Sequence, residues 1–263
     1  MLNTTVLRIL RGGTAGALLT LGSLALSTAQ DMPKPQWVVV TVSKIKPDMR
    51  LQYEGFQKEL SAAYKKANVP YRVMYQNIFG DLSEYTSVYP IPDFANMDGD
   101  SPTVRALGND RSAELIRKGS QYLNDVRRTV LVMRPDLSVM EKTPRLLAYA
   151  VVSRLTLAVG KEHDFDQWMQ SEFNPAMKTG GVTQIFTYQQ VFGGSPDYVS
   201  ITPLDKLAVI DAGHPAWKME GGRAAADKMF ARTAGIVTSG DTNIVRLRPD
   251  LGYFPGAPAA SNK

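Results

Sequence analysis

Two histidines are the first residues to weigh for chemistry, because an imidazole titrates near neutral pH and serves as acid, base or metal ligand. His163 begins a predicted helix, where Asp166 shares its face three residues later. Such a pair is typical of a general base or half a metal site, and the competing interpretation is a solvated first turn. His214 precedes Pro215 in a predicted loop, where it acts as an acid or base or only caps the next helix. We name His214 and His163 as the catalytic candidates.

Tyrosines on predicted strands form the second group, since a phenol can hold a ligand carbonyl or pack on an aromatic ring. Tyr75 and Tyr188 are 113 residues apart, and so are Tyr85 and Tyr198. We predict these four as ligand-binding residues, together with Arg248, whose guanidinium matches a carboxylate. The alternatives are tyrosines that pack with their hydroxyls at a wet edge, and an arginine that supports the turn after it.

Several kinds of chemistry are excluded or unsupported by the composition. The chain has no cysteine, which excludes disulfides, thiolate catalysis and Cys-ligated metal centres. It has no phosphate-binding glycine loop, Gly-x-Ser-x-Gly elbow or His-Glu-x-x-His helix. No third ligand accompanies the histidines at regular spacing, so we expect no metal site and no cofactor. The formal net charge is +5, without basic runs that interleave with aromatics, so we expect no nucleic-acid partner.

Residues 1–29 have the order of a secretory signal peptide. Arg8 and Arg11 precede an apolar run over 14–26, and Ser27 and Ala29 supply small residues before a cut after Ala29. The run is too short to span a bilayer, which takes about 20 residues. We expect export to the periplasm or the extracellular space, with no stable membrane span after signal cleavage. An uncleaved anchor is the alternative.

The rest of the chain is an internal duplication. The sequence Arg-Pro-Asp-Leu occurs at 134–137 and again at 248–251, 114 residues later. Phe79-Gly80 and Phe192-Gly193 are 113 apart, and Val42-Ser43 matches Val152-Ser153 at 110. Their collinear order predicts two copies of one unit. The expected divisions are a first repeat at 30–137, a linker at 138–146, a second repeat at 147–254 and a flexible tail at 255–263.

Each repeat is predicted to run strand, helix, strand, strand, helix, strand, the ferredoxin-like pattern. In the first repeat we expect strands at 37–45, 71–79, 84–90 and 129–134, with helices from 47 to about 67 and over 110–125. In the second we expect strands at 147–155, 182–192, 197–202 and 243–248, with helices over 162–177 and 222–234. Both helices of a repeat cover one sheet face, so the bare faces predict two repeats packed sheet to sheet in an α+β barrel, an internal pseudo-dimer.

This pattern resembles the dimeric α+β barrel superfamily, near its NIPSNAP-like, EthD-like and antibiotic-biosynthesis-monooxygenase-like groups. The residues that carry the resemblance are Val42-Ser43, Pro47-Asp48 with Tyr53 and Phe56, Phe79-Gly80 with Tyr85, and Phe94, and their counterparts are Val152-Ser153, Gly160 with Phe165 and Trp168, Phe192-Gly193 with Tyr198, and Leu207. The resemblance implies a cavity between sheet and helices. The superfamily includes cofactor-free oxygenases, small-ring isomerases, haem enzymes and members without assigned activity, so the resemblance does not imply one particular activity. Neither His163 nor His214 lies in a haem-branch motif.

Two functions follow as hypotheses. The first is an exported small-molecule-binding or structural barrel module, with a small apolar or aromatic ligand as its partner, and it predicts a closed barrel without a convergent polar cluster. The alternative is a cofactor-free oxygenase or isomerase acting on a small aromatic or carbonyl compound. It predicts a histidine beside paired tyrosines in an apolar cavity. The duplication is compatible with a monomer or a homodimer.

Overall fold

The computed structural model describes residues 36–142 and 145–254. The expected signal peptide, the tail and part of the linker lie outside these residues. The strands are β1 (Trp37–Ile45), β2 (Val73–Asn77), β3 (Glu84–Ile91), β4 (Leu123–Met133), β5 (Tyr149–Leu157), β6 (Phe186–Phe192), β7 (Tyr198–Leu204) and β8 (Val237–Leu247). The helices are α1 (Arg50–Lys66), α2 (Pro102–Leu107), α3 (Asn109–Ser120), α4 (Glu162–Trp168), α5 (Asn174–Thr179) and α6 (Gly222–Ala231). A π-helical turn, η4 (Met169–Phe173), joins α4 to α5, and the 3-10 turns are η1 (Pro47–Met49), η2 (Phe94–Met97), η3 (Pro135–Leu137), η5 (Leu207–Ala212) and η6 (Pro215–Lys218).

The eight strands close into one barrel in the order β1-β3-β2-β8-β5-β7-β6-β4. The first repeat supplies β4-β1-β3-β2 and the second β8-β5-β7-β6, so each has the ferredoxin-like order, and the predicted fold class is confirmed. Closure occurs by antiparallel pairing of strand edges, β2 with β8 and β4 with β6. The two sheets are therefore one hydrogen-bonded wall, in which every strand has a paired neighbour on each side, although the first halves of β4 and β8 pair along one edge only.

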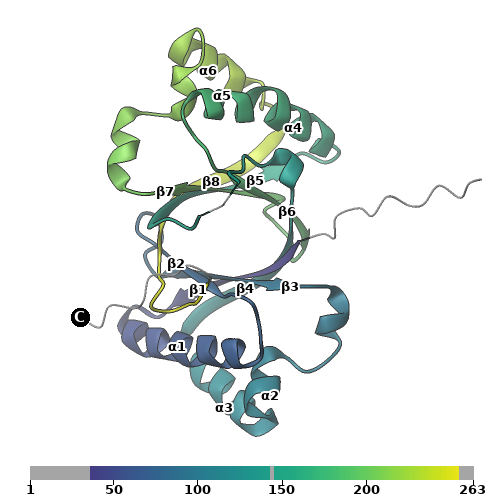
Figure 1. Ribbon diagram of the computed structural model, residues 1–263, viewed down its shortest axis with the longest axis vertical. Coiled ribbons are helices and arrows are strands. Elements are labelled where there is room, and N and C mark those ends of the chain that lie inside the picture. Colours follow the sequence, from purple (N-terminus) through teal and green to yellow (C-terminus); the bar gives the residue numbers. More distant parts are fainter. Residues whose placement is uncertain (1–35, 143–144, 255–263) are drawn as a thin grey trace, which may run out of the picture. The chain divides into compact units, whose positions relative to one another are not determined.

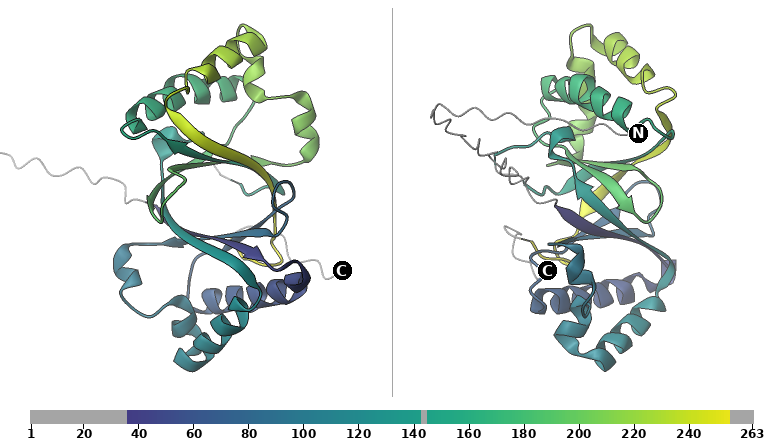
Figure 2. Two further views of the ribbon diagram at one scale, coloured as in Figure 1. Left: turned by 180° about the vertical axis from the view of Figure 1, so that it is seen from behind. Right: turned by 90° about the vertical axis from the view of Figure 1, so that its right-hand side faces the viewer.

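The helices lie outside the barrel, α1 to α3 against the strands of the first repeat and α4 to α6 against those of the second (Figures 1 and 2). Each helical layer encloses its own buried core. Tyr53, Met74 and Tyr85 are central in the first, and Phe165, Ile185 and Tyr198 in the second. Alternate strand residues face these cores, while the others face the space inside the barrel, which we call the lumen. None of the helices in the described residues is long and apolar enough to cross a membrane.

Strand register corrects one of the sequence matches. Ser43 pairs with Tyr85, and Leu155 pairs with Tyr198. Because Tyr85 and Tyr198 are equivalent, Ser43 corresponds to Leu155, an offset of 112 residues. The match of Val42-Ser43 to Val152-Ser153 at 110 was therefore wrong by two residues, which is one period of the strand's pleat.

Two helix ends were also placed too far along the chain. The helix expected over 110–125 ends at Ser120, and β4 already begins at Leu123. The helix expected over 222–234 ends at Ala231, and β8 begins at Val237. The first halves of β4 and β8 are exposed and polar, so they lack the apolar alternation that marks a strand.

Candidate functional site

The lumen holds a small, mostly apolar cavity of about 50 Å³ to which all eight strands contribute. Its lining comprises Val38, Val40, Tyr75, Thr86, Val88, Leu131, Val152, Arg154, Tyr188, Val199, Ile201 and Val245. Most of these residues are β-branched because such side chains fill a narrow barrel well. The cavity is far smaller than the roughly 300–1,000 Å³ typical of pockets for drug-sized ligands. It is also below the roughly 150 Å³ that admits benzene to an engineered cavity.

Tyr75 and Tyr188 bring two equivalent phenols into this cavity. Among the described residues, neither hydroxyl has a hydrogen-bond partner; the Tyr75 side chain is buried and that of Tyr188 is partly buried. Burial raises the pKa of Tyr75 and of Tyr188, and the neighbouring Tyr71 adds to both shifts. Both phenols are therefore neutral donors at physiological pH, and no described residue accepts a hydrogen bond from them.

Gln190 adds an acceptor to the same lumen. It pairs with Leu131 between β4 and β6, and residues paired in an antiparallel ladder share a face, so its side chain lies on the lumen side. Its Oε1 atom is buried without a hydrogen-bond partner in the described part of the chain. A buried amide oxygen without a donor is costly, which favours a water molecule or a ligand beside it.

An ion pair borders the cavity on β3 and β5. Arg154 Nη2 lies 2.7 Å from Glu84 Oε1, and Arg154 Nη1 lies 3.3 Å from Asp241 Oδ2. Asn77 also donates to Glu84, at 3.4 Å. With the offset of 112, the counterpart of Arg154 in the first repeat is Val42, so this ion pair has no equivalent there.

Tyr85 and Arg248 lie outside the lumen, in a polar cluster that joins the two repeats. Arg248 follows β8 and holds Glu54 of α1 with two hydrogen bonds, Nη1 to Oε1 at 2.8 Å and Nη2 to Oε2 at 3.0 Å. Tyr85 donates to the same carboxylate at 2.6 Å, and Arg50 does so at 3.1 Å. Asp250 then accepts from Arg248 Nε and Nη2 at 2.8 and 2.7 Å. An arginine of the second repeat thus clamps a helix of the first.

A matching cluster around Tyr198 joins the repeats in the opposite direction. Arg134 follows β4 and donates through Nη2 to Asp166 of α4 at 2.6 Å. Tyr198 donates to Asp166 at 2.8 Å, and Asp136 accepts from Arg134 Nε at 3.0 Å. Arg134 Nη1 donates to Gln189 at 2.7 Å, as Arg248 does to Gln76 at 2.9 Å. The second cluster has no equivalent of Arg50, because the matching position on α4 is Glu162.

The pKa shifts follow from these contacts. Arg248, then Tyr85 and Arg50, hold the pKa of Glu54 down to about 2, against the opposing effect of burial. Burial and the hydrogen bond to Glu54 raise the pKa of Tyr85 to about 12. Burial would lower the pKa of Arg248, but its bonds to Asp250 and Glu54 outweigh this and raise it. These two clusters of converging polar groups contradict the expectation that the barrel would have none. Their charged groups bond to one another, so neither cluster offers a free group to a ligand.

The repeated Arg-Pro-Asp-Leu turn also exchanges a leucine between repeats. Leu251, from the end of the second repeat, is buried in the core of the first, and Leu137 is buried in the core of the second. Ser61 of α1 donates to the carbonyl of Leu251 at 2.6 Å, and Asn174 of α5 donates to that of Leu137 at 3.0 Å. Each turn therefore gives the other repeat both an arginine that bonds to a helix carboxylate and a leucine that is buried in its core.

Acid should weaken the first cluster through Glu54. Its pKa is lower in the folded chain than the ordinary value of 4.5, so its contribution is complete above pH 4.5 and is lost as the pH falls towards 2. After a discount for solvent screening, we expect about 2 kcal/mol of unfolding free energy to disappear across this window. Urea denaturation at pH 7 and pH 2.5 measures it. Glu54→Gln should flatten the dependence, whereas the exposed Glu59→Gln on the same helix should not; an unchanged slope in Glu54→Gln contradicts the assignment.

The two histidines lie apart from the lumen tyrosines. His163 is exposed in the first turn of α4, and Asp166 bonds to Arg134 and Tyr198. His214 accepts a hydrogen bond from the backbone N–H of Ala216 through Nδ1. Its ring lies edge-on to Phe230, with centroids 5.2 Å apart, and burial lowers its pKa. His214 therefore caps η6 within the helical layer, and a catalytic role for either residue stays a prediction.

Neither a metal nor haem fits the residues that the structure describes. Within the described residues, no three His, Asp or Glu side chains gather as ligands of a metal ion. For haem, the space between the sheet and α4 to α6 is filled by a buried core that includes Phe165, Trp168, Met169 and Met229. His214 has one ring nitrogen engaged as a cap.

Sequence reasoning missed the partners that explain Tyr85, Tyr198 and Arg248. Glu54 matches Asp166 at the offset of 112, and Gln76 matches Gln189 at 113. These matches were available signals, because each lies beside an aromatic or strand match that was recognised. Asp166 was considered only as a partner of His163. Glu84 and Gln190 carried no signal, since their counterparts in the other repeat, Asp197 and Asn77, are different residues.

Comparison with solved structures agrees with the closed α+β barrel fold. An anthrone oxidase-like protein matches at a TM-score of 0.57 and 10% identity, covering 87% of this chain and 97% of that chain. A protein from Fusobacterium nucleatum with a provisional assignment as a monooxygenase matches at 0.55 and 9%, covering 82% and 94%. Chlorite dismutase from Candidatus Nitrospira defluvii, in complex with imidazole, matches at 0.52 and 10%, covering 82% and 92%. No protein-family model and no curated protein sequence matches the chain.

Proposed function

We propose that this protein is a binding module whose lumen takes a small uncharged molecule with a hydrogen-bond-accepting oxygen, such as a short-chain ketone or aldehyde. The observation that carries the proposal is the pair of cavity-lining tyrosines, Tyr75 and Tyr188, whose hydroxyls have no acceptor among the described residues. A ligand carbonyl between them would accept from both. The apolar walls suit an alkyl body, and about 50 Å³ limits it to a few heavy atoms.

Binding should depend on the two hydroxyls and can be followed by NMR with selectively labelled tyrosine rings. Titration with 2-butanone is expected to shift the Tyr75 and Tyr188 signals saturably and to leave Tyr85 and Tyr198 unchanged. Tyr75→Phe or Tyr188→Phe should weaken binding about five- to tenfold, the value of one hydrogen bond of about 1 kcal/mol. Tyr122→Phe, outside the lumen, is the matched control.

The same variants test whether the hydroxyls are unpartnered in the ligand-free protein. Removing a cavity-facing hydroxyl that lacks a partner should leave the unfolding free energy unchanged or raise it, by up to about 1 kcal/mol. A loss of stability would mean that a hidden partner exists. Absence of a saturable shift with 2-butanone, or equal affinity in all three variants, would refute a lumen site.

The alternative of a cofactor-free oxygenase or isomerase has less support from the geometry. The assignments of the anthrone oxidase-like and monooxygenase neighbours point towards oxygen chemistry, but their identity to this chain is about one residue in ten. The alternative needs a histidine beside the tyrosines, whereas His214 contacts Phe230 and His163 is exposed. The cavity is also too small for an aromatic substrate unless the barrel widens.

We further propose that the chain is exported, that residues 1–29 are removed, and that the mature protein is a monomer. The order of residues in 1–29 supports export, and barrel closure by the chain's own strands supports the monomer. The likeness to NIPSNAP-like proteins stays a prediction. Intact-mass analysis and light scattering of protein recovered from outside the cytoplasm test both points; a mass that includes residues 1–29, or a dimer, would contradict them.

A further inference from the structure

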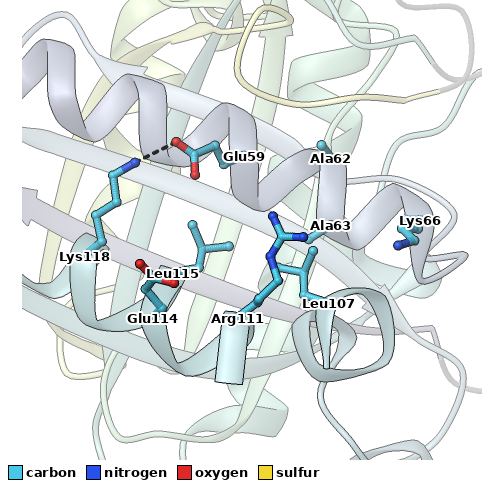
Figure 3. A pocket seen from close by; sticks show the side chains of 9 residues that line it. All are labelled: Glu59, Ala62, Ala63, Lys66, Leu107, Arg111, Glu114, Leu115 and Lys118. Atoms are coloured by element: carbon cyan, nitrogen blue, oxygen red, sulfur yellow. Dashed lines mark hydrogen bonds and ion pairs between the residues drawn. The ribbon is translucent and has the colours of Figure 1, made fainter. Parts of the chain in front are cut away.

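Hydroxyls that lack a partner away from the surface distinguish the lumen from a larger groove between α1 and α3 (Figure 3). The groove has a volume of about 470 Å³, and all of its charged side chains are exposed. Lys118 bonds to Glu59 across it at 2.8 Å. Water and this ion pair satisfy the polar groups of the groove, so the groove gives no indication of a ligand. The lumen differs, because its tyrosines place unpartnered hydroxyls inside the barrel.

Tyr71 adds a third phenol to the lumen beside Tyr75 and Tyr188. It precedes β2 on the same face as Val73 and Tyr75, because the intervening Arg72 bonds to α1 on the helix side. The partly buried side chain of Tyr71 packs against the apolar cluster of the lumen, which includes Tyr75. Among the described residues, no group bonds to the hydroxyl of Tyr71. Three phenols therefore face the lumen without an acceptor.

The hydroxyls of these three tyrosines lie near one another. Burial is the main cause of the raised pKa of Tyr75 and of Tyr188, and Tyr71 adds to both shifts. Tyr75 also raises the pKa of Tyr188. The electrostatic effect of one phenol on another falls with distance, so these mutual effects agree with three oxygens around a common space.

Tyr75 and Tyr188 are related by the internal symmetry of the barrel, whereas Tyr71 has no equivalent. Four antiparallel steps separate β1 from β5, so the two strands run in the same direction and the pseudo-twofold axis runs along the lumen. Tyr75 and Tyr188 therefore lie on opposite sides of that axis. The counterpart of Tyr71 at the offset of 113 is Gln184, whose amide bonds to the backbone of Arg145 at 2.9 and 2.6 Å. The third donor is thus present on one side only.

Three donors need more than one acceptor atom. A carbonyl oxygen has two lone pairs, which Tyr75 and Tyr188 would fill from opposite sides. Tyr71 then needs a second oxygen, and the small cavity places that oxygen on a carbon next to the carbonyl. A hydroxyl suits this place better than a second carbonyl because it also donates, and the buried Oε1 atom of Gln190 on the lumen side lacks a donor within the described residues.

We propose that Tyr71 is a third ligand-binding residue of the lumen and that the ligand is a small ketone or aldehyde with a hydroxyl on the neighbouring carbon. This inference rests on the lumen site proposed above and narrows its ligand from carbonyl compounds in general to α-hydroxy carbonyl compounds. The carbonyl oxygen accepts from Tyr75 and Tyr188, and the hydroxyl oxygen accepts from Tyr71.

The compounds 2-butanone and 3-hydroxy-2-butanone test the second oxygen, because they share one carbon skeleton. Binding to the mature protein is followed by NMR with labelled tyrosine rings. We expect 3-hydroxy-2-butanone to bind about fivefold more tightly, the value of one hydrogen bond, and to shift the signal of Tyr71 as well as those of Tyr75 and Tyr188. In Tyr71→Phe the two compounds should bind equally, with the affinity that 2-butanone has for the unchanged protein.

Tyr122→Phe, outside the lumen, is the matched control and should keep the preference. The inference is overturned if 3-hydroxy-2-butanone binds no more tightly than 2-butanone, or if the preference survives in Tyr71→Phe. Loss of the preference in Thr86→Val instead would assign the second oxygen to the Thr86 hydroxyl of the lining and overturn the role of Tyr71. Circular dichroism establishes that each variant is folded.

Failure of this inference and failure of the lumen site give different results. Saturable binding of 2-butanone that weakens in Tyr75→Phe, without a preference for the hydroxy ketone, would overturn the role of Tyr71 alone. Absence of binding of both compounds would refute the lumen site and this inference with it.

Discussion

Arg248→Ala is expected to lower the free energy of unfolding by about 3 kcal/mol, because it leaves the Glu54 carboxylate part-buried without its main partner. Arg50 still reaches Glu54, but it is more than half exposed and compensates only in part. For a domain of this size, the midpoint of thermal unfolding should fall by roughly 6–12 °C. Calorimetry or urea denaturation measures the change.

An arginine in an exposed ion pair provides the control for Arg248→Ala. Arg223 pairs with Asp227 along α6, where both side chains are mostly in solvent, and lies 4.8 Å from the ring centroid of Trp217, so Arg223→Ala should cost about 1 kcal/mol or less. Equal losses in the two variants would show that Arg248 does not hold the repeats together.

Hydrogen exchange locates the effect of Arg248→Ala. The amides of Arg72 and Tyr253 bond to each other's carbonyls where the end of the second repeat lies on the first. We expect these two amides to exchange faster in Arg248→Ala, while amides in β5 and β7 keep their relative protection. Uniform acceleration over the whole barrel would instead indicate global destabilisation without local release of the turn.

The duplication could be predicted from the sequence because the residues that reveal it lie in short continuous segments. Two Arg-Pro-Asp-Leu turns and two Phe-Gly pairs recur at nearly constant spacing, and each repeat has the strand and helix order of one unit. The contacts of these residues could not be predicted in the same way, since the sequence is equally compatible with Arg248 contacting its own repeat or the other repeat. Only strand closure, β2 with β8 and β4 with β6, places it on Glu54.

The division of the four predicted tyrosines into two pairs, on opposite faces of the sheet, also could not be predicted without the fold. Tyr75 and Tyr188 face the lumen, whereas Tyr85 and Tyr198 face the helices and bond to carboxylates. Alternation along a strand gives two faces but does not say which of them encloses a ligand. An aromatic residue suits either face here, so residue type could not decide between them.

Buried Arg72 differs from the rest of the first core, and its counterpart in the second repeat suggests how to replace it. Its guanidinium donates to Ser61 at 2.7 Å and to Gln57 at 2.6 Å and lies 5.5 Å from the ring centroid of Tyr64. Within the described residues no carboxylate pairs with it, and burial lowers its pKa. At the same place the second repeat has Ile185, which packs in one core with Met169, the counterpart of Gln57.

Arg72→Ile is therefore expected to lower the free energy of unfolding by about 2–3 kcal/mol. The substitution leaves the buried Gln57 Oε1 without its donor and leaves space where the longer side chain lay. Urea denaturation at neutral pH measures the loss.

The double variant Gln57→Met/Arg72→Ile should recover about half of that loss or more, because it replaces a buried charge and its acceptor with the apolar pair of the second repeat. Ser61 still donates to Leu251, so the exchanged turn keeps its anchor. The single variant Gln57→Met should be the least stable of the three, since it leaves a buried guanidinium with one acceptor fewer. If the double variant is no more stable than Arg72→Ile, the arginine contributes more than its bond to Gln57, and its position over Tyr64 becomes the contact to test next.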